Sequence, residues 1–243
     1  TTSITINNVP PTVSLMGVTQ PNPGFVLPGD LLGFTGSYMD PGTLDTHSST
    51  WDFGDGATAT GTMSPLHAYS APGDYTVTLT VLDNDGGLGF DTIQITVDTP
   101  ESAVGGITGN LELLELPADA PAGLGKQYDR AMDSLQAVQD NLDSGQTSAA
   151  LSDLASVVRR LSALGDRLDG ADEIIDQVIT VTHTIVTERL KEAIQDANTF
   201  PERFFLRIGI SMLQRAQRFA MMDRVRPAMA LYSTTYRLLD RIQ

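Results

Sequence analysis

Apolar and polar residues alternate in several short runs within the first hundred positions. The longest run is Gly73–Val81, where every second residue is apolar and threonines stand between them. Its apolar members are Tyr75, Val77, Leu79 and Val81. A period of two predicts a β-strand with one face buried and the other in water. Shorter runs near Val13, over Leu32–Ser37 and up to Phe53 predict further strands, separated by turns rich in Gly, Pro and Asp.

The period changes in the second half of the chain. From Leu124 onward, apolar residues recur at spacings of three and four, which predicts amphipathic helices. We expect about five helices, delimited by glycine and proline signals. They cover residues 124–142, 147–164, 171–197, 201–222 and 227–242. The middle of the third helix, Val178–Thr187, is rich in β-branched residues and predicts a kink or a buried span. Residues 99–110 contain Pro, Ser and three Gly, a composition typical of a linker.

One long motif lies in the β half. Trp51-Asp52-Phe53-Gly54-Asp55-Gly56 is followed by His67-Ala68-Tyr69, by the alternating run from Gly73, and by Asp83-Asn84-Asp85-Gly86-Gly87. Together these segments resemble the polycystic-kidney-disease (PKD) domain. The resemblance implies an immunoglobulin-like β-sandwich over residues 10–98 that has no catalytic site. Trp51, the single Trp of the chain, is expected to fill the core between the two sheets.

The helical half begins with a second pattern. Its members are Leu114-Glu115-Leu116-Pro117, Leu124-Gly125-Lys126, Ala131, Leu135, Ser144–Leu151 and Leu154. Their spacing resembles a FIMAH-like module, a small helical domain of secreted bacterial and archaeal proteins that often follows PKD repeats. The resemblance covers residues 110–180 and implies an extracellular or cell-surface location. The predicted fold class is therefore multidomain, all-β plus all-α: a β-sandwich followed by an α-helical bundle over residues 111–243.

Residues 1–9 predict a separate short strand. Ile4-Thr5-Ile6-Asn7 repeats the pattern of Ile95-Thr96-Val97-Asp98 at the end of the sandwich. We interpret this segment as the last strand of a preceding module, with Ile4 and Ile6 on its apolar face. A lone strand leaves backbone groups without partners. It is therefore expected to dock on its own domain, to be disordered, or to add to the sheet of a neighbouring subunit.

Charge is distributed unevenly along the chain. The formal net charge is −15, and the first hundred residues contain ten Asp but no Glu, Lys or Arg. Such an acidic body argues against nucleic-acid binding. No apolar run approaches the ~20 residues of a membrane helix, so we expect no membrane insertion. The chain contains no cysteine, which excludes disulfides and thiolate metal sites.

The sign of the charge reverses in residues 201–243, where eight Arg face three acidic residues. Six of these arginines alternate with Phe and Met: Arg203, Arg207, Arg215, Arg218, Arg224 and Arg226. Arg, aromatic residues and Met are enriched at protein interfaces, so these arginines are candidate contact residues. The alternative is a solvated helix face. The Phe and Met residues among them are predicted to lie in the core because of their helical spacing.

The sandwich loops hold several carboxylates that suit calcium, which takes six to eight oxygen ligands. They are Asp40, Asp45, Asp55, Asp83, Asp85 and Asp91. From this set we name Asp40, Asp83, Asp85 and Asp91 as candidate Ca²⁺ ligands. The alternative is ordinary turn chemistry, since Asp and Asn followed by Gly favour turns. Asp52 and Asp55 are expected to hold their turn through hydrogen bonds to the backbone.

No catalytic constellation is present in the sequence. The three histidines, His47, His67 and His183, are far apart, and no zinc-protease, esterase or nucleotide-binding motif occurs. We therefore predict no enzyme and no resident cofactor other than calcium. The expected function is that of an extracellular structural or adhesive protein, a self-assembling or partner-binding component of a cell-surface layer, sheath or filament. The alternatives are a non-catalytic accessory segment of a secreted hydrolase and a linker stiffened by calcium.

Overall fold

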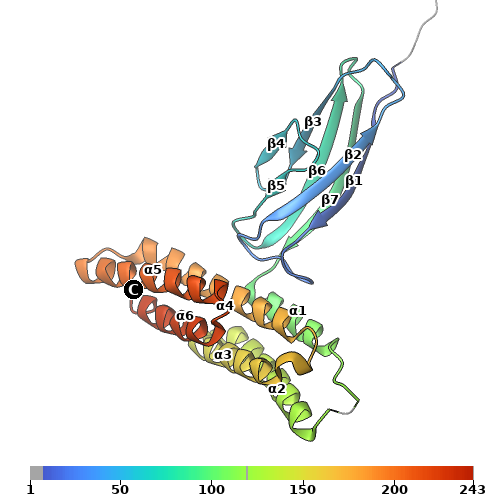
Figure 1. Cartoon of the computed structure of the whole chain (residues 1–243). Coiled ribbons are helices and arrows are strands. Elements are labelled where there is room, and N and C mark those ends of the chain that lie inside the picture. The colour runs from blue at the N-terminus through green and yellow to red at the C-terminus, as the bar shows by residue number, and fades with distance from the viewer. Residues whose placement is uncertain (1–7, 119, 243) are drawn as a thin grey trace, which may run out of the picture. The chain divides into compact units, whose positions relative to one another are not determined.

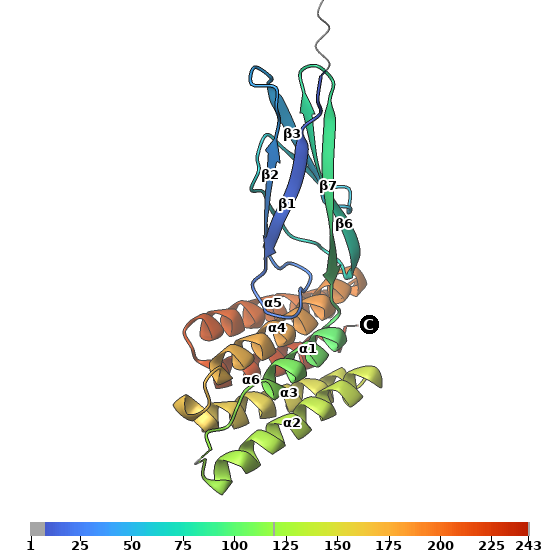
Figure 2. The ribbon, with the colours of Figure 1, turned by 90° about the vertical axis from the view of Figure 1, so that its right-hand side faces the viewer.

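The alternating residues of the N-terminal unit build two antiparallel sheets (Figures 1 and 2). A computed structural model describes residues 8–118 and 120–242, and its contacts divide the chain into two units that meet between residues 98 and 99. One sheet has the order β1-β2-β5 and the other β4-β3-β6-β7. The strands are β1 Thr12–Thr19, β2 Leu32–Met39, β3 His47–Asp52, β4 Thr58–Thr60, β5 Leu66–His67, β6 Gly73–Asp83 and β7 Leu88–Val97. Together with the helical region that follows, they confirm the predicted fold class.

Aromatic residues fill the space between the sheets. Trp51 has no exposed surface and packs with Phe34 and Phe53, and its indole N–H donates to the Thr62 carbonyl at 2.9 Å. The Tyr69 hydroxyl donates to the Phe53 carbonyl at 3.0 Å. These two buried side-chain polar groups thereby keep a partner, without which their burial would be costly. The predicted role of Trp51 in the core is confirmed.

The turn after β3 is held as predicted. Asp52 Oδ1 accepts from the Gly54 N–H at 2.9 Å, and Asp55 Oδ1 accepts from the Ala57 N–H at 3.0 Å. Gly54 has a φ of 81° and lies against the backbone of Thr76, so that a Cβ at this position would come within 2.7 Å of the Thr76 oxygen. Both the backbone angle and the close approach require glycine here.

The C-terminal unit consists of helices. Its described residues form α1 Pro100–Glu112, α2 Ala122–Asp143, α3 Thr147–Leu164, the short 3₁₀ helix Gly165–Arg167, α4 Ala171–Asp196, α5 Phe200–Met221 and α6 Val225–Leu239. The five predicted helices correspond to α2 through α6. Helix α4 contacts α1, α3, α5 and α6. The β-branched middle of α4 is therefore a buried span. There the hydroxyl of Thr182 donates a hydrogen bond to the Val178 carbonyl at 2.7 Å.

The predicted linker over residues 99–110 is wrong, because α1 occupies it. Thr99 caps the helix by accepting from the Ser102 N–H at 3.3 Å, and Pro100 stands in the first turn, where its missing N–H costs nothing. The buried residues Ala103, Val104, Ile107 and Leu111 follow helical spacing, whereas Gly105 and Gly109 lie on the exposed side. Burial of this apolar stripe outweighs the low helix propensity of glycine. The helical unit thus begins at residue 99 rather than 111.

None of the described helices combines the length and apolar character of a membrane span.

Candidate functional site

Helix α5 has an outward face that other helices leave uncovered, and we call it the α5 face. Its start is fixed by a capping box, in which Glu202 Oε2 accepts from the Thr199 N–H at 2.7 Å. The helix packs against α4 and α6 through Gly209, Leu213 and Ala216, its fully buried residues. The opposite side carries a stripe at spacings of three and four, which places its members on one surface. They are Phe200, Phe204, Arg207, Ser211, Arg215, Arg218 and Met222.

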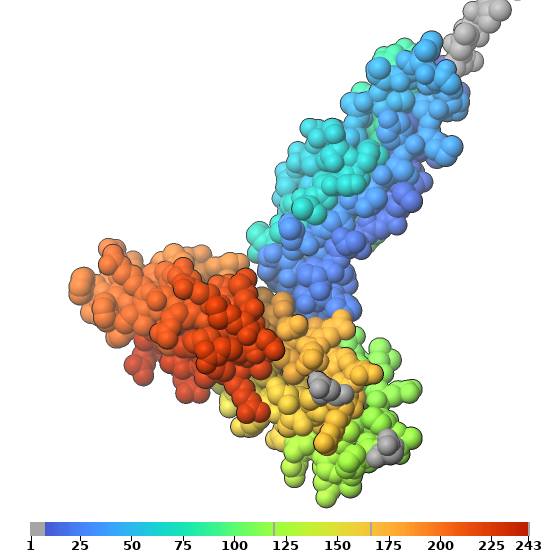
Figure 3. Space-filling view, viewed as in Figure 1, coloured from blue at the N-terminus to red at the C-terminus, as the bar shows by residue number. Residues whose placement is uncertain are grey.

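The core placement predicted for the Phe and Met residues is wrong for four of them. Phe200 is 85% exposed, and Phe204, Met221 and Met222 are also exposed. Met229, on α6, is buried as predicted. Helical spacing identifies a stripe, but it does not say whether a neighbouring helix covers that stripe. In Figure 3 the orange surface of α5 forms a margin of the helical unit.

All six predicted contact arginines are exposed, and those on α5 lie beside the Phe and Met residues (Arg203, Arg207, Arg215, Arg218, Arg224 and Arg226). Within the part of the chain that the structure describes, none of them lies within ion-pair distance of a carboxylate. Arg224 instead places its guanidinium 4.8 Å from the centre of the Phe219 ring. The α5 face is therefore cationic and partly apolar. Ile4 and Ile6, the other predicted contact residues, lie outside the described residues.

A second candidate is a group of carboxylates at one end of the sandwich. Asp40 follows β2, Asp45 precedes β3, and Asp83 ends β6. One carboxylate oxygen from each lies within 4.8 Å of those of the other two. Two of the four predicted calcium ligands, Asp40 and Asp83, are thus brought together. Asp45 lies beside them because the loop before β3 returns toward the end of β6. The sequence motifs did not predict this approach.

Hydrogen bonds make the three carboxylates unequal. His47 Nε2 lies 2.8 Å from Asp40 Oδ2, and the hydrogen bond from His47, aided by the Gly42 N–H, holds the pKa of Asp40 below its ordinary value. Asn8 donates to Asp83 Oδ2 at 2.9 Å, and this bond is the main cause that lowers the pKa of Asp83. Burial and the neighbouring Asp40 charge raise the pKa of Asp45.

The other two predicted ligands, Asp85 and Asp91, do not belong to this group. Asp91 Oδ2 accepts from the Leu15 N–H of β1 at 2.7 Å, and its Oδ1 accepts from the Thr92 N–H at 2.8 Å. Asp91 therefore ties β7 to β1 and has a structural role. The cluster of Asp40, Asp45 and Asp83 offers the hard oxygen donors that suit calcium, but a cation would compete with the donors already bound to Asp40 and Asp83.

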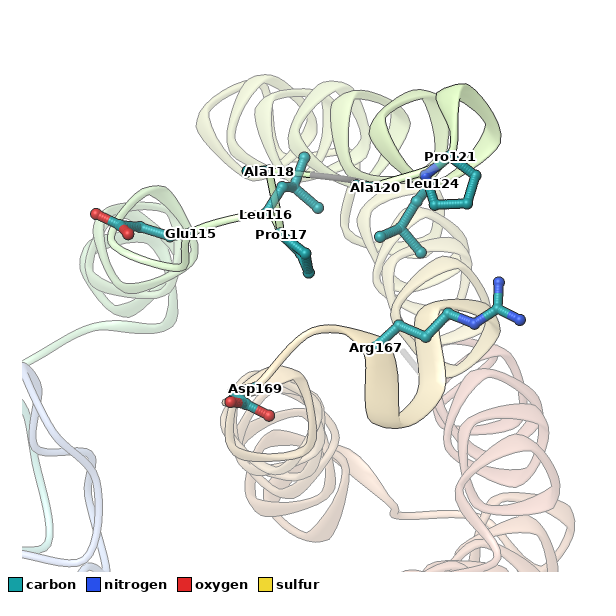
Figure 4. A pocket seen from close by; sticks show the side chains of 9 residues that line it. All are labelled: Glu115, Leu116, Pro117, Ala118, Ala120, Pro121, Leu124, Arg167 and Asp169. Atoms are coloured by element: carbon teal, nitrogen blue, oxygen red, sulfur yellow. The ribbon is translucent and has the colours of Figure 1, made fainter.

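One hollow of the helical unit is lined mainly by apolar residues. It has a volume of about 750 Å³ and lies between the start of α2 and the segment after α3. In Figure 4 Pro117 and Leu124 project into it, while the charged ends of Glu115 and Arg167 lie at opposite sides.

Two of the histidines pack against neighbouring side chains and contact polar partners. His67 stacks on Phe53 with ring centroids 4.1 Å apart and contacts Asp55 through Nε2 at 2.8 Å. His183 is half-buried in α4, where the Gln217 side chain approaches its Nε2 at 3.0 Å. Burial lowers the pKa of His183.

Comparisons with known proteins identify the β unit. The PKD domain family matches residues 8–97. Over 59 residues the chain is 42% identical to the microbial collagenase of Vibrio alginolyticus, a match that covers 24% of this chain and 7% of that protein. The chain thus spans a small fraction of that relative's length.

Two solved PKD1 domains are also similar to this chain. The one from Vibrio anguillarum Epp is 26% identical, with 38% of this chain and 98% of that chain covered and a TM-score of 0.30. The one from the Vibrio cholerae metalloprotease PrtV is 28% identical, with 37% and 100% covered and a TM-score of 0.29. The FIMAH-like resemblance of the helices remains a prediction. Residues 8–97 are a PKD domain, as their motifs predicted.

Proposed function

We propose that this chain is a non-catalytic segment of an extracellular protein, in which the PKD domain is a spacer and the helical unit makes a protein–protein contact. The α5 face is the observation that carries this proposal. Exposed aromatic residues and Met, set among arginines without ion-pair partners, match the composition of interface centres. A solvated helix needs no exposed Phe at two successive turns, because each exposed ring keeps apolar surface in water.

The proteins that contain similar PKD domains support an extracellular location. The PKD family matches residues 8–97, and parts of this chain are similar to a microbial collagenase and to the PKD1 domain of a metalloprotease. Their names describe enzymes that act on proteins, and collagen is an extracellular substrate. This supports an extracellular or cell-surface setting, where a self-assembling chain would form part of a layer, sheath or filament.

The collagenase likeness also favours a second candidate function. The chain would then be an accessory segment of a secreted hydrolase, and the PKD domain would hold another domain at a distance from an insoluble protein substrate. In this case the chain should bind collagen fibrils and remain monomeric. Self-association is what the first proposal predicts, so the two functions are distinguishable in solution.

Calcium belongs to the proposal as a stiffening ligand. Asp40, Asp45 and Asp83 would hold the ion, which would relieve the repulsion that raises the pKa of Asp45. Binding to the folded state alone would stabilise the PKD domain by linkage. The ion would join the β2–β3 loop to the end of β6.

Sedimentation velocity of the whole chain across protein and salt concentrations tests the proposed function. Association that weakens with salt supports an arginine-mediated contact, because exposed charges are screened over about 10 Å at 0.1 M salt. Phe204→Ser should weaken it, whereas the matched control Leu113→Ser, which also alters an exposed apolar residue of the helical unit, should not. Monomers that bind collagen fibrils would replace the first proposal with the second. Monomers that bind no collagen would overturn both.

A further inference from the structure

We propose that the partner of the α5 face is the outer face of β6 and β7 in a second copy of this chain. The inference rests on the proposed function and names its partner. It follows from two exposed surfaces, one in each unit, whose charges are opposite and whose apolar groups are both left uncovered. Among residues 8–118 and 120–242, no element of the same unit covers either surface.

The surface on the β unit is an apolar patch on the outer side of the larger sheet. Leu82, Leu88 and Phe90 are exposed, and Phe90 retains 64% of its accessible surface. Leu82 pairs with Leu88 across the two strands, and Thr80 pairs with Phe90 in the next row. Because side chains alternate along a strand, these residues share the face opposite to buried Val81. We call Leu82, Leu88 and Phe90 the β6–β7 patch.

Acidic residues accompany the β6–β7 patch on the same face. Asp52 pairs with Thr78 on β6, and Asp74 pairs with Thr96 on β7, and both carboxylates are exposed. Residues 8–98 contain no Lys or Arg that could neutralise them. This face therefore combines apolar side chains with uncompensated negative charge, which is the complement of the α5 face.

Charge decides between the possible pairings of copies. Two α5 faces would set arginines against arginines, and two β6–β7 patches would set carboxylates against carboxylates. Juxtaposed like charges oppose association, whereas opposite charges guide it and fix its register. The favoured contact joins α5 of one copy to the β6–β7 patch of the next. Such a contact is heterologous, so it leaves one free surface at each end and generates rings or open filaments.

Matched pairs of variants on the whole chain test this pairing. Phe204→Asp places a negative charge on the α5 face, and Phe90→Arg places a positive charge on the β6–β7 patch. Leu113→Asp and Leu66→Arg make the same changes at exposed apolar residues elsewhere in the two units, Leu66 being on β5 of the smaller sheet. Far-UV circular dichroism and thermal unfolding confirm that each variant is folded. Sedimentation velocity and light scattering then give the mass distributions.

Each of the two face variants should associate roughly thirtyfold more weakly than the wild type, the effect of losing one central aromatic contact. The two controls should assemble like the wild type. A mixture of Phe204→Asp and Phe90→Arg should stop at dimers, because the first retains an intact β6–β7 patch and the second an intact α5 face. A capped dimer is a result that only a heterologous contact between these two surfaces produces.

The failures of the inference and of the proposed function are distinguishable. If Phe204→Asp abolishes association and Phe90→Arg leaves it unchanged, the β6–β7 patch is not the partner, although the α5 contact stands. If both variants assemble like the wild type, the contact through α5 is itself wrong. If the wild type stays monomeric at every concentration, a second copy of the chain is not the partner. The collagen-binding assay then decides the function.

Discussion

Gly36 offers a sharp test of how the PKD core is packed. It lies in β2 directly against Trp51, and a Cβ added there would overlap the Leu79 Cδ2 methyl and lie 3.2 Å from Trp51 Cζ2. Both neighbours have no exposed surface, so neither can move into solvent. We predict that Gly36→Ala destabilises the domain because one methyl group must enter a filled space.

The size of the effect is the difference between two terms. Overpacking a core by a methyl group costs about 1–3 kcal/mol. Replacing glycine in a strand interior recovers about 0.5–1 kcal/mol of backbone entropy. The net loss of stability is therefore about 0–2.5 kcal/mol. Leu79→Val removes the overlapped methyl and costs about 1 kcal/mol alone. In the double variant the two changes should compensate, so that its loss is smaller than the sum by about 0.5–2 kcal/mol.

Urea unfolding followed by tryptophan fluorescence measures these values. Trp51 is the single Trp of the chain and lies in this core, so the signal reports only the β unit. Gly17→Ala, at a β1 position where no atom lies within 4 Å of an added Cβ, is the control and should not destabilise. If the effect of Gly36→Ala simply adds to that of Leu79→Val in the double variant, the close packing around Trp51 is refuted.

Three further predictions concern charged groups. Arg189 donates to the Leu239 and Ile242 carbonyls at 3.0 and 2.7 Å. Arg189→Met should therefore destabilise the helical unit by about 2 kcal/mol, measured by urea unfolding followed by circular dichroism. An unchanged unfolding midpoint would show that these hydrogen bonds do not stabilise the unit. Burial lowers the pKa of His183 below 6.5, so the unfolded state binds the proton more tightly and the stability of the helical unit should fall as the pH drops below 6.5. His183→Gln should flatten this dependence of stability on pH. An equal slope in both proteins would mean that another group causes the pH dependence. Asp45→Asn should raise the melting temperature of the PKD domain in EDTA, because it removes a repelled charge. Calcium should stabilise the wild type more than the variant. An equal effect of calcium on both proteins would show that Asp45 is not a ligand.

Sequence patterns located most elements because local spacing determines them. Trp51 and the alternation after Gly73 identified the sandwich, and apolar spacing located α2 through α6 within a few residues. Helix α1 was missed because Gly105, Gly106 and Gly109 suggested a linker, although Ile107 and its buried neighbours follow a helical stripe. Tertiary burial, which a local window does not contain, decides that case.

The candidate sites depended more strongly on tertiary structure. The arginines of α5 were predicted as contacts from composition alone, but the exposure of Phe200 became visible only once the neighbours of α5 were known. Likewise, Asp40 and Asp83 lie 43 positions apart in the sequence, and the β3–β6 pairing is what brings their loops together with Asp45. Two of the four carboxylates named from the sequence therefore belong to the cluster, and calcium binding there stays a prediction.

The absence of basic residues in the PKD domain has a consequence for its durability. The first Lys or Arg of the sequence is Lys126, within α2. Proteases that cut after Lys or Arg therefore have no cleavage site in the first 125 residues, even when the domain is unfolded. Among trypsin-like enzymes this domain would outlast the helices attached to it. The same asymmetry directs amine chemistry, because both lysines, Lys126 and Lys191, lie in the helical unit. Coupling through lysine would tether the protein by its helices and leave the sandwich free.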